Sequence, residues 1–193
     1  MSARQICWLM VLMLAACSHA PEIRYYTLSA EPVAKPSAAS VSGRWVVDAV
    51  AIPDLLDRPQ IVLHSGANRV DVLDDDRWAA PVADMIQRVV AANLSSRLGS
   101  QAVSDPGLPS SGAARGIGIS ILELTAGHDE QCVLDASWEI ARTNSGEINR
   151  SAAHRGHYIA ATHGTGPTQI VATMSHLLGA FADDIAETLL NDK

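Results

Sequence analysis

The sequence predicts an α+β fold in which two amphipathic helices pack on a largely antiparallel β-sheet. Three observations lead to this prediction. Two long segments carry apolar residues at helical spacing, several shorter segments alternate apolar and polar residues as strands do, and the order along the chain is strands, helix, strands, helix. That order suggests an α+β sandwich with the helices on one side of the sheet.

The N-terminal part of the fold is expected to consist of short strands. The first is Arg24–Leu28 (RYYTL), which is rich in residues that favour strands. Residues 29–43 contain two prolines and several serines, so we expect a long loop there, within one domain rather than between two. A second strand is predicted over Arg44–Ile52, and Pro53 ends it.

A hairpin and the first helix are expected to follow the turn-rich connector PDLLDRP. The hairpin strands are Gln60–His64 and Arg69–Leu73. Pro81 is the expected first residue of the helix, and Gly99 is its expected stop. Trp78 should pack over the first helical turn or the adjoining hairpin. The predicted buried face of this helix comprises Val82, Met85, Ile86, Val89, Val90, Leu94 and Leu98.

The second half of the chain is expected to form an antiparallel meander and then a second helix. A Gly/Pro/Ser loop over Ser100–Arg115 precedes a strand that contains Ile117, Ile119 and Ile121 and runs to about Thr125. The next strand alternates Leu134, Ala136, Trp138 and Ile140 with polar residues, and Ile148–Ala160 is expected to continue as the third strand. Pro167 opens the second helix, whose predicted buried face comprises Ile170, Met174, Leu177, Leu178, Phe181, Ile185 and Leu189.

The N-terminus has the pattern of a secretory signal that ends in a lipidation site. Met1–Gln5 is polar and carries Arg4, and Ile6–Leu14 is an apolar core too short to cross a bilayer as a helix. Leu14-Ala15-Ala16-Cys17 matches the lipobox of bacterial lipoproteins. In that reaction small residues fit the peptidase, the Cys17 thiol takes the diacylglyceryl group, and cleavage leaves Cys17 as the acylated N-terminus.

These features give three predicted segments. Residues 1–16 form a signal peptide that is cleaved before lipidated Cys17, residues 17–23 form a short tether, and residues 24–193 form a single α+β domain. Because more than one acyl chain gives a stable membrane anchor, we expect the mature protein to stay on the membrane with its body close to the surface. Ser18, rather than Asp, follows the cysteine, and this favours the outer membrane.

Composition and charge narrow the classes of partner. The chain has a net charge of −7, and removal of the signal with Arg4 makes it −8. An acidic chain without a basic run argues against binding to nucleic acid, and against binding to an anionic lipid surface by charge. Cys7 leaves with the signal and Cys17 is acylated, so Cys132 has no partner within the mature chain. Cys132 is interpreted as a buried apolar thiol, with a reactive nucleophile as the alternative.

Candidate metal sites are not supported by the spacing of their residues. Three consecutive carboxylates, Asp74–Asp76, cannot converge on one ion without a dedicated loop. They are expected instead to cap the start of the helix, where negative charge meets the positive end of the dipole. His154 and His157 lie three apart on a predicted strand, so they point to opposite faces and cannot chelate together. His128 and His163 lie in polar stretches and are expected at the surface.

No sequence motif argues for catalysis. GTGPTQ at 164–169 lacks the lysine and the spacing of a phosphate loop, and RGIGIS enters a strand rather than leaving one. There is no G-x-S-x-G nucleophile elbow, and no local signature groups serine, histidine and aspartate into a triad. The expected protein is therefore not an enzyme and uses no cofactor or metal.

The chain resembles a known family of lipoproteins along nearly its whole mature length. The matching features are the lipobox at Leu14–Cys17, YYTL at 25–28, PDLLDRPQIV at 53–62, RWAAPV at 77–82 and LDASWEI at 134–140. Their order and spacing are similar to those of the PqiC-type, or ABC-type transport auxiliary, lipoproteins. The loop at Ser100–Arg115 is long for that pattern, which bears on the local geometry.

The resemblance implies a role as well as a place in the cell. Such proteins are outer-membrane lipoproteins that work with an inner-membrane complex whose MCE-domain subunit reaches across the periplasm. The complex is thought to move lipids or other hydrophobic molecules and to support membrane integrity. The family has no known catalytic residues, so only Cys17 carries over as a site, and some members form ring-like homo-oligomers.

Two other classes of function stay open on the sequence alone. A structural lipoprotein would bind peptidoglycan or an outer-membrane assembly machine, and would co-purify with cell wall or a β-barrel instead of an MCE subunit. A lipid-anchored hydrolase would need serine, histidine and aspartate to converge in a pocket of the fold.

Overall fold

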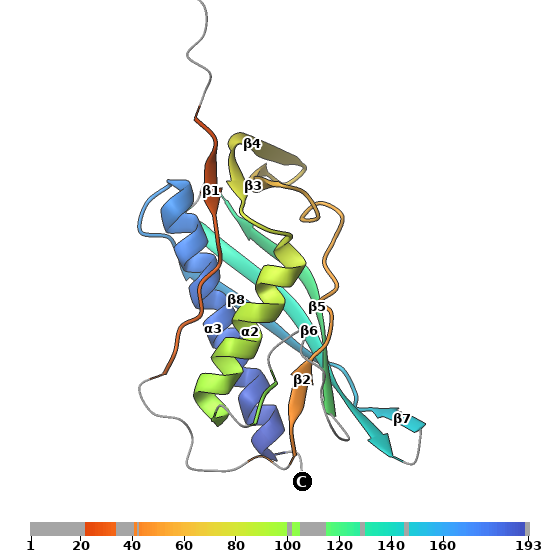
Figure 1. Ribbon diagram of the computed structural model, residues 1–193. Coiled ribbons are helices and arrows are strands. Elements are labelled where there is room, and N and C mark those ends of the chain that lie inside the picture. The colour runs from red at the N-terminus through yellow and green to blue at the C-terminus, as the bar shows by residue number, and fades with distance from the viewer. Residues whose placement is uncertain are drawn as a thin grey trace, which may run out of the picture.

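The structure is a computed structural model that describes residues 22–33, 41, 43–99, 102–104, 115–127, 130–144 and 147–191. Figure 1 shows two helices lying side by side across one face of a sheet, with a hairpin at one end of the molecule. The elements in chain order are β1 (Arg24–Tyr26), β2 (Trp45–Val47), β3 (Gln60–Gly66), β4 (Arg69–Trp78), α2 (Val82–Leu98), β5 (Arg115–Ala126), β6 (Gln131–Asn144), β7 (Glu147–Arg150), β8 (His154–Ala161) and α3 (Pro167–Asn191).

The α+β fold class is confirmed, but the strands form two sheets instead of one. A three-stranded sheet has the order β1-β4-β3, and a five-stranded sheet has the order β2-β5-β6-β7, with β8 also paired to β6. The pairs β3–β4, β5–β6, β6–β7 and β6–β8 are antiparallel, as expected. The two short N-terminal strands are different, because β1 pairs in parallel with β4 and β2 pairs in parallel with β5.

The two helices are the elements that the sequence predicted best. Every residue predicted on the buried face of either helix is buried. Helix α3 begins at Pro167 as expected, whereas α2 begins at Val82, one residue after Pro81. The Pro81 carbonyl accepts the first helical hydrogen bond from Met85 N–H at 3.1 Å. Gly99 ends α2 with φ +95°, a conformation that glycine adopts without steric cost.

The prediction for Asp74–Asp76 was wrong, because these residues continue strand β4 rather than cap α2. In the β3–β4 ladder, Gln60 pairs with Arg77 while Ile61 pairs with Leu73, so the three aspartates form a bulge. Bulges bend a strand and re-aim its side chains. The bulge separates a proximal part of β4, which pairs with β1, from a distal part that forms the hairpin with β3.

The predicted third meander strand, Ile148–Ala160, is interrupted. The chain leaves the sheet at residues 151–153 and divides the segment into β7 and β8, which pair with different parts of β6. The Ser151 side chain fills the gap: its Oγ accepts a hydrogen bond from Ile140 N–H at 3.0 Å and donates one to the Ala152 carbonyl at 3.0 Å. These bonds satisfy backbone groups that a continuous ladder would have paired.

The core lies between the five-stranded sheet and the two helices. The alternating residues of β5 and β6 face it, and Trp45 and Phe181 are among its largest fully buried side chains. Trp138 packs edge-on against Phe181, with ring centroids 5.6 Å apart. Cys132 is fully buried, as predicted, and its Sγ lies 3.8 Å from the Ile170 carbonyl oxygen. Trp78 is also buried, at the end of β4.

Candidate functional site

The N-terminal segment of the body is fastened to the rest of the molecule at two places. Cys17, the predicted lipid attachment site, lies outside the described residues. The described residues begin at Glu22, and they form β1 and then a segment, Thr27–Val33, that we call the strap. Figure 1 shows the strap continuing from β1 alongside the two helices.

The first attachment is at β1, around the buried carboxylate of Asp76. Arg24 donates two hydrogen bonds of 2.7 Å to it, one to each oxygen, and the Tyr26 hydroxyl donates a third at 2.9 Å. The hydrogen bond to Asp76 raises the pKa of the Arg24 guanidinium. Burial, and then the hydrogen bond to Asp76, raise the pKa of Tyr26. A buried charge needs partners of this kind, and both come from the N-terminal strand.

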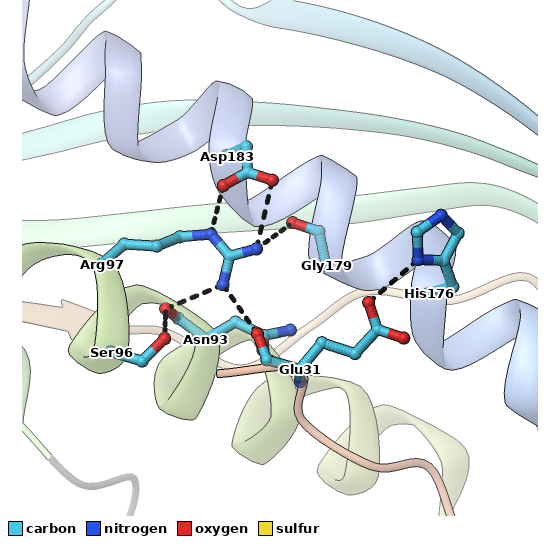
Figure 2. Close-up of polar contacts among 7 residues, drawn as sticks. All are labelled: Glu31, Asn93, Ser96, Arg97, His176, Gly179 and Asp183. Atoms are coloured by element: carbon cyan, nitrogen blue, oxygen red, sulfur yellow. Dashed lines mark hydrogen bonds and ion pairs between the residues drawn. The ribbon is translucent and has the colours of Figure 1, made fainter. Parts of the chain in front are cut away.

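The second attachment is at the strap, and it centres on Arg97 in the last turn of α2. The Arg97 side chain is only 9% exposed. Its Nε and Nη2 bind both oxygens of Asp183 on α3, and Nη2 also donates to the Gly179 carbonyl at 3.0 Å. Nη1 donates to the backbone carbonyls of Glu31 and Asn93, each at 3.2 Å. All five guanidinium donors are therefore used, as Figure 2 shows.

Further hydrogen bonds hold the strap against both helices. Glu31 N–H donates to Asn93 Oδ1 on α2 at 2.7 Å, and Ser29 N–H donates to Ser175 Oγ on α3 at 3.1 Å. The Glu31 carboxylate also lies 2.9 Å from Nδ1 of His176 on α3 (Figure 2). The strap thus bridges the two helices through its backbone and through one side-chain pair.

Gly179 makes this close approach possible. A Cβ at its position would lie 3.1 Å from Glu31 Oε2 and 3.7 Å from Arg97 Nη2. Glycine inside a helix costs about 1 kcal/mol relative to alanine. Here it leaves room for the strap and exposes its carbonyl oxygen to Arg97 (Figure 2).

The residues considered as metal ligands have other partners. Asp76 is occupied by Arg24 and Tyr26. His154 and His157 point to opposite faces of β8, as predicted: His154 stacks on Trp138 with centroids 5.2 Å apart, and His157 Nδ1 lies 2.8 Å from Asp135. Among the described residues, no group of three or more His, Cys, Asp or Glu side chains could hold a metal ion.

One cavity, of about 580 Å³, tests the hydrolase alternative directly because Ser151, His154 and Asp184 all line it. The Ser151 hydroxyl donates to the Ala152 carbonyl, and His154 lies flat on Trp138. Asp184 accepts a hydrogen bond from the Tyr158 hydroxyl at 2.6 Å. Burial and this bond raise the pKa of Tyr158 well above its usual value. A nucleophile needs a hydrogen bond to its base, and in this cavity each group is directed elsewhere.

The residue pattern of α2 contains a signal for the strap site that the sequence analysis missed. Asn93 and Arg97 fall on the buried stripe of α2 at helical spacing with Ile86 and Val90. A buried arginine and asparagine on an apolar face require partners, which the strap and α3 provide.

Within the part of the chain that the structure describes, no helix is long and apolar enough to span a bilayer.

Comparisons with known proteins agree with this picture. The family model for the ABC-type transport auxiliary lipoprotein component matches residues 26–186. The intermembrane transport lipoprotein PqiC of Escherichia coli K12 is 27% identical over 130 residues, which cover 66% of this chain and 68% of that protein. PqiC of Shigella flexneri matches to the same extent.

Two crystal structures share the fold at low sequence identity. An uncharacterized protein superposes with a TM-score of 0.70 at 18% identity, covering 87% of this chain and 99% of that chain. A protein from Xanthomonas campestris superposes with a TM-score of 0.67 at 13% identity, covering 86% and 95%. The two structures support the fold, and the family model extends over most of the sequence. The chain therefore belongs to the PqiC-type family of ABC-type transport auxiliary lipoproteins.

Proposed function

We propose that this auxiliary lipoprotein is anchored in the outer membrane through acylated Cys17, faces the periplasm and docks the far end of a periplasm-spanning MCE-domain subunit. The subunit belongs to an inner-membrane transport complex. The cargo is a lipid or another hydrophobic molecule, and the pathway supports membrane integrity.

The observation that carries the proposal is the family match over residues 26–186, which begins at β1. The lipobox cysteine lies only a few residues before β1, and β1 and the strap are fastened to the body around Asp76 and Arg97. An anchor at Cys17 would therefore hold the folded body near the membrane. Such a protein contributes position and contact area to a transport path.

A docking role needs no chemistry from this chain. In the cavity that Ser151 and His154 line, the Ser151 hydroxyl is hydrogen-bonded to backbone, and His154 is stacked on Trp138. We propose accordingly that the protein is not an enzyme. The benefit of a continuous path is physical, since exposure of apolar surface to water costs about 25 cal/mol per Å². Exposing both acyl chains of a phospholipid to water would cost a free energy of roughly tens of times the thermal energy.

The test of docking is crosslinking in intact cells, combined with an envelope-stress assay of the deletion strain. We expect an MCE subunit among the crosslinked products of the acylated protein, and we expect the deletion strain to be sensitive to detergents. The Cys17→Ala variant is the matched control, because it removes the anchor and leaves the body unchanged. We expect this variant to leave the membrane fraction and to lose the crosslink.

Three results would contradict the proposal. Recovery of peptidoglycan or a β-barrel assembly protein, without an MCE subunit, would favour the structural lipoprotein. Turnover of an ester or glycan substrate by the purified body would favour the hydrolase. A Cys17→Ala protein that stays in the membrane as a processed, fatty-acid-labelled form would show that the anchor is elsewhere.

A further inference from the structure

Large apolar side chains are exposed at the end of the molecule where β1 begins. Ile23 and Tyr25 are 40% and 65% exposed, and Val70 and Val72 in the β3–β4 hairpin are each 37% exposed. Arg24 and Tyr26 turn inward to Asp76, so strand alternation turns Ile23 and Tyr25 outward. Figure 1 shows the hairpin and the start of β1 at the same end, opposite the end at which the C-terminus is marked.

The bulge in β4 explains why the hairpin lies at this end. β1 pairs only with Asp76–Trp78, which begin at the last residue of the bulge and continue beyond it. The distal part of β4, which carries Val70 and Val72, pairs with β3 and extends past the point at which β1 begins to pair. The turn of the hairpin is therefore among the parts of the described body that lie farthest toward the anchored end.

The length of chain between the anchor and β1 limits how far this end can stand from a membrane. This step rests on the proposed anchor at Cys17. Only Ser18–Ile23 separates Cys17 from Arg24. These residues reach about 20 Å at full extension, and about 13 Å as a flexible coil. The headgroup layer itself occupies about 6 Å on each side of the hydrocarbon core.

The exposed side chains at this end suit a phospholipid surface. Tyrosine has an apolar ring with a polar tip, and it is enriched at the boundary between membrane and water. Arg69, next to the hairpin turn, has a side chain that is 76% exposed and an exposed 3.2 Å pair with Asp71. Such pairs are weak in water, so the guanidinium can turn to a lipid phosphate. The net charge of −7 disfavours attraction by charge alone, so the contact is mainly apolar.

We propose that Ile23, Tyr25 and the tip of the β3–β4 hairpin rest in the phospholipid headgroup layer beside acylated Cys17. The body then touches the bilayer through protein as well as through lipid. A lipid anchor alone leaves the body free to rotate and tilt. A second contact at the hairpin fixes the orientation in which the rest of the molecule faces the periplasm.

The experiment places a fluorophore at each end of the acylated, full-length mature protein. Val70→Cys carries an environment-sensitive dye at the hairpin, and Ile148→Cys carries it in β7. Ile148 is a matched control because it is a β-branched strand residue, is 63% exposed, and lies in a strand far from the anchored end in Figure 1. Cys132 is fully buried, so the dye reacts at the introduced cysteine.

The labelled proteins are placed in vesicles of phosphatidylethanolamine and phosphatidylglycerol. We expect the emission of the Val70 dye to shift to shorter wavelength, and headgroup-linked nitroxides to quench it. The Ile148 dye should show neither effect. Adding Ile23→Ser and Tyr25→Ser should weaken the quenching at position 70 while the protein stays on the vesicles.

Three results would overturn the proposal. Equal, weak quenching at positions 70 and 148 on vesicle-bound protein would mean that the body stands clear of the lipid, while the anchor itself survives. A Val70 signal that persists in detergent and grows with protein concentration would assign the surface to a second copy of the chain. Protein that does not sediment with vesicles would refute the anchor at Cys17, and this contact with it.

Discussion

The two places where the N-terminal segment is fastened use opposite arrangements of charge. At β1, the body supplies a buried acid, Asp76, and the segment supplies the side chains of Arg24 and Tyr26 that neutralise it. At the strap, the body supplies both the buried base, Arg97, and its acid, Asp183, and the segment adds a backbone carbonyl. The first attachment therefore depends on the sequence of the segment, whereas the second depends mainly on the path of its backbone.

The largest loss of stability is expected from a substitution at Trp78, the apolar residue paired with β1 at the first attachment. Trp78 pairs in register with Tyr26 and is 7% exposed. We expect Trp78→Ala to lower the free energy of unfolding by about 4 kcal/mol, because it removes a buried indole and leaves a cavity. Urea denaturation measures this, with Trp78→Phe as a milder control. Unchanged stability combined with loss of partner binding would make Trp78 a docking residue instead.

The next largest loss of stability is expected from a substitution at Arg97, the buried base of the second attachment. We expect Arg97→Met to lower the free energy of unfolding by about 3 kcal/mol, because Asp183 and three backbone carbonyls, one in the strap and two in the helices, lose a buried partner. Arg88→Met is the matched control, since Arg88 lies on the exposed face of the same helix. We expect the control to change stability by less than about 0.5 kcal/mol. Equal losses in both variants would show that Arg97 does not fasten the strap.

A smaller effect is expected at the acid of the first attachment. Asp76→Asn keeps the shape of the side chain but removes its charge and replaces one of the two acceptor oxygens with an amide donor. At least one of the hydrogen bonds from Arg24 and Tyr26 is then lost, so we expect stability to fall by about 1–2 kcal/mol. Asp74→Asn, on an exposed carboxylate of the same strand, should have no measurable effect. Amide hydrogen exchange across β1 should rise in Asp76→Asn only. Similar exchange in the two variants would contradict the role of Asp76.

The same variant changes the pH dependence at the alkaline end. The pKa of Tyr26 is raised by burial and by Asp76, so its contribution to stability is complete below the unfolded value of about 10. That contribution is lost as the pH rises through the folded-state pKa. In Asp76→Asn one of the two causes is removed, so phenol absorbance should report a lower pKa for Tyr26. An unchanged titration would mean that burial alone sets the pKa.

The smallest effect is expected from the side-chain pair of the strap. Glu31 and His176 are both partly exposed, and pairs of this kind contribute about 0.3 kcal/mol. We expect Glu31→Gln to leave the melting temperature nearly unchanged, because the Glu31 backbone still bonds to Asn93 and Arg97. A loss as large as that of Arg97→Met would reverse the comparison, and would give the side chain of Glu31 the main role at the strap.

The parts of the fold that local patterns determine could be predicted, and the parts that depend on distant partners could not. Both helices and the strands β5 and β6 follow from apolar periodicity, which is a property of neighbouring residues. The three aspartates were misassigned because the last of them, Asp76, binds Arg24 and Tyr26, about fifty positions away in the sequence. The division into two sheets could not be predicted either, because the pairing of β1 and β2 depends on distant strands and the two segments are too short to show that it is parallel.

The candidate site also has a part that could be predicted from local sequence and a part that could not. The lipobox is a local signal, so Cys17 could be proposed from sequence, although it lies outside the described residues. The Arg97 site joins α2, α3 and the strap, and only the polar residues on the buried stripe of α2 pointed to it. Ser151 and His154 line one cavity, as a hydrolase would require, but the Ser151 hydroxyl donates to the Ala152 carbonyl and His154 stacks on Trp138.

The parallel pairing of β1 with β4 has a mechanical consequence. If Cys17 carries the proposed lipid anchor, a pull on that anchor would act along the axis of β1, so the hydrogen bonds between β1 and β4 would be stretched together in shear rather than opened one at a time. The strap would carry the remaining force into the two helices through its hydrogen bonds to Arg97, Asn93 and Ser175. The folded body would thus resist unfolding from its N-terminal end under such a pull.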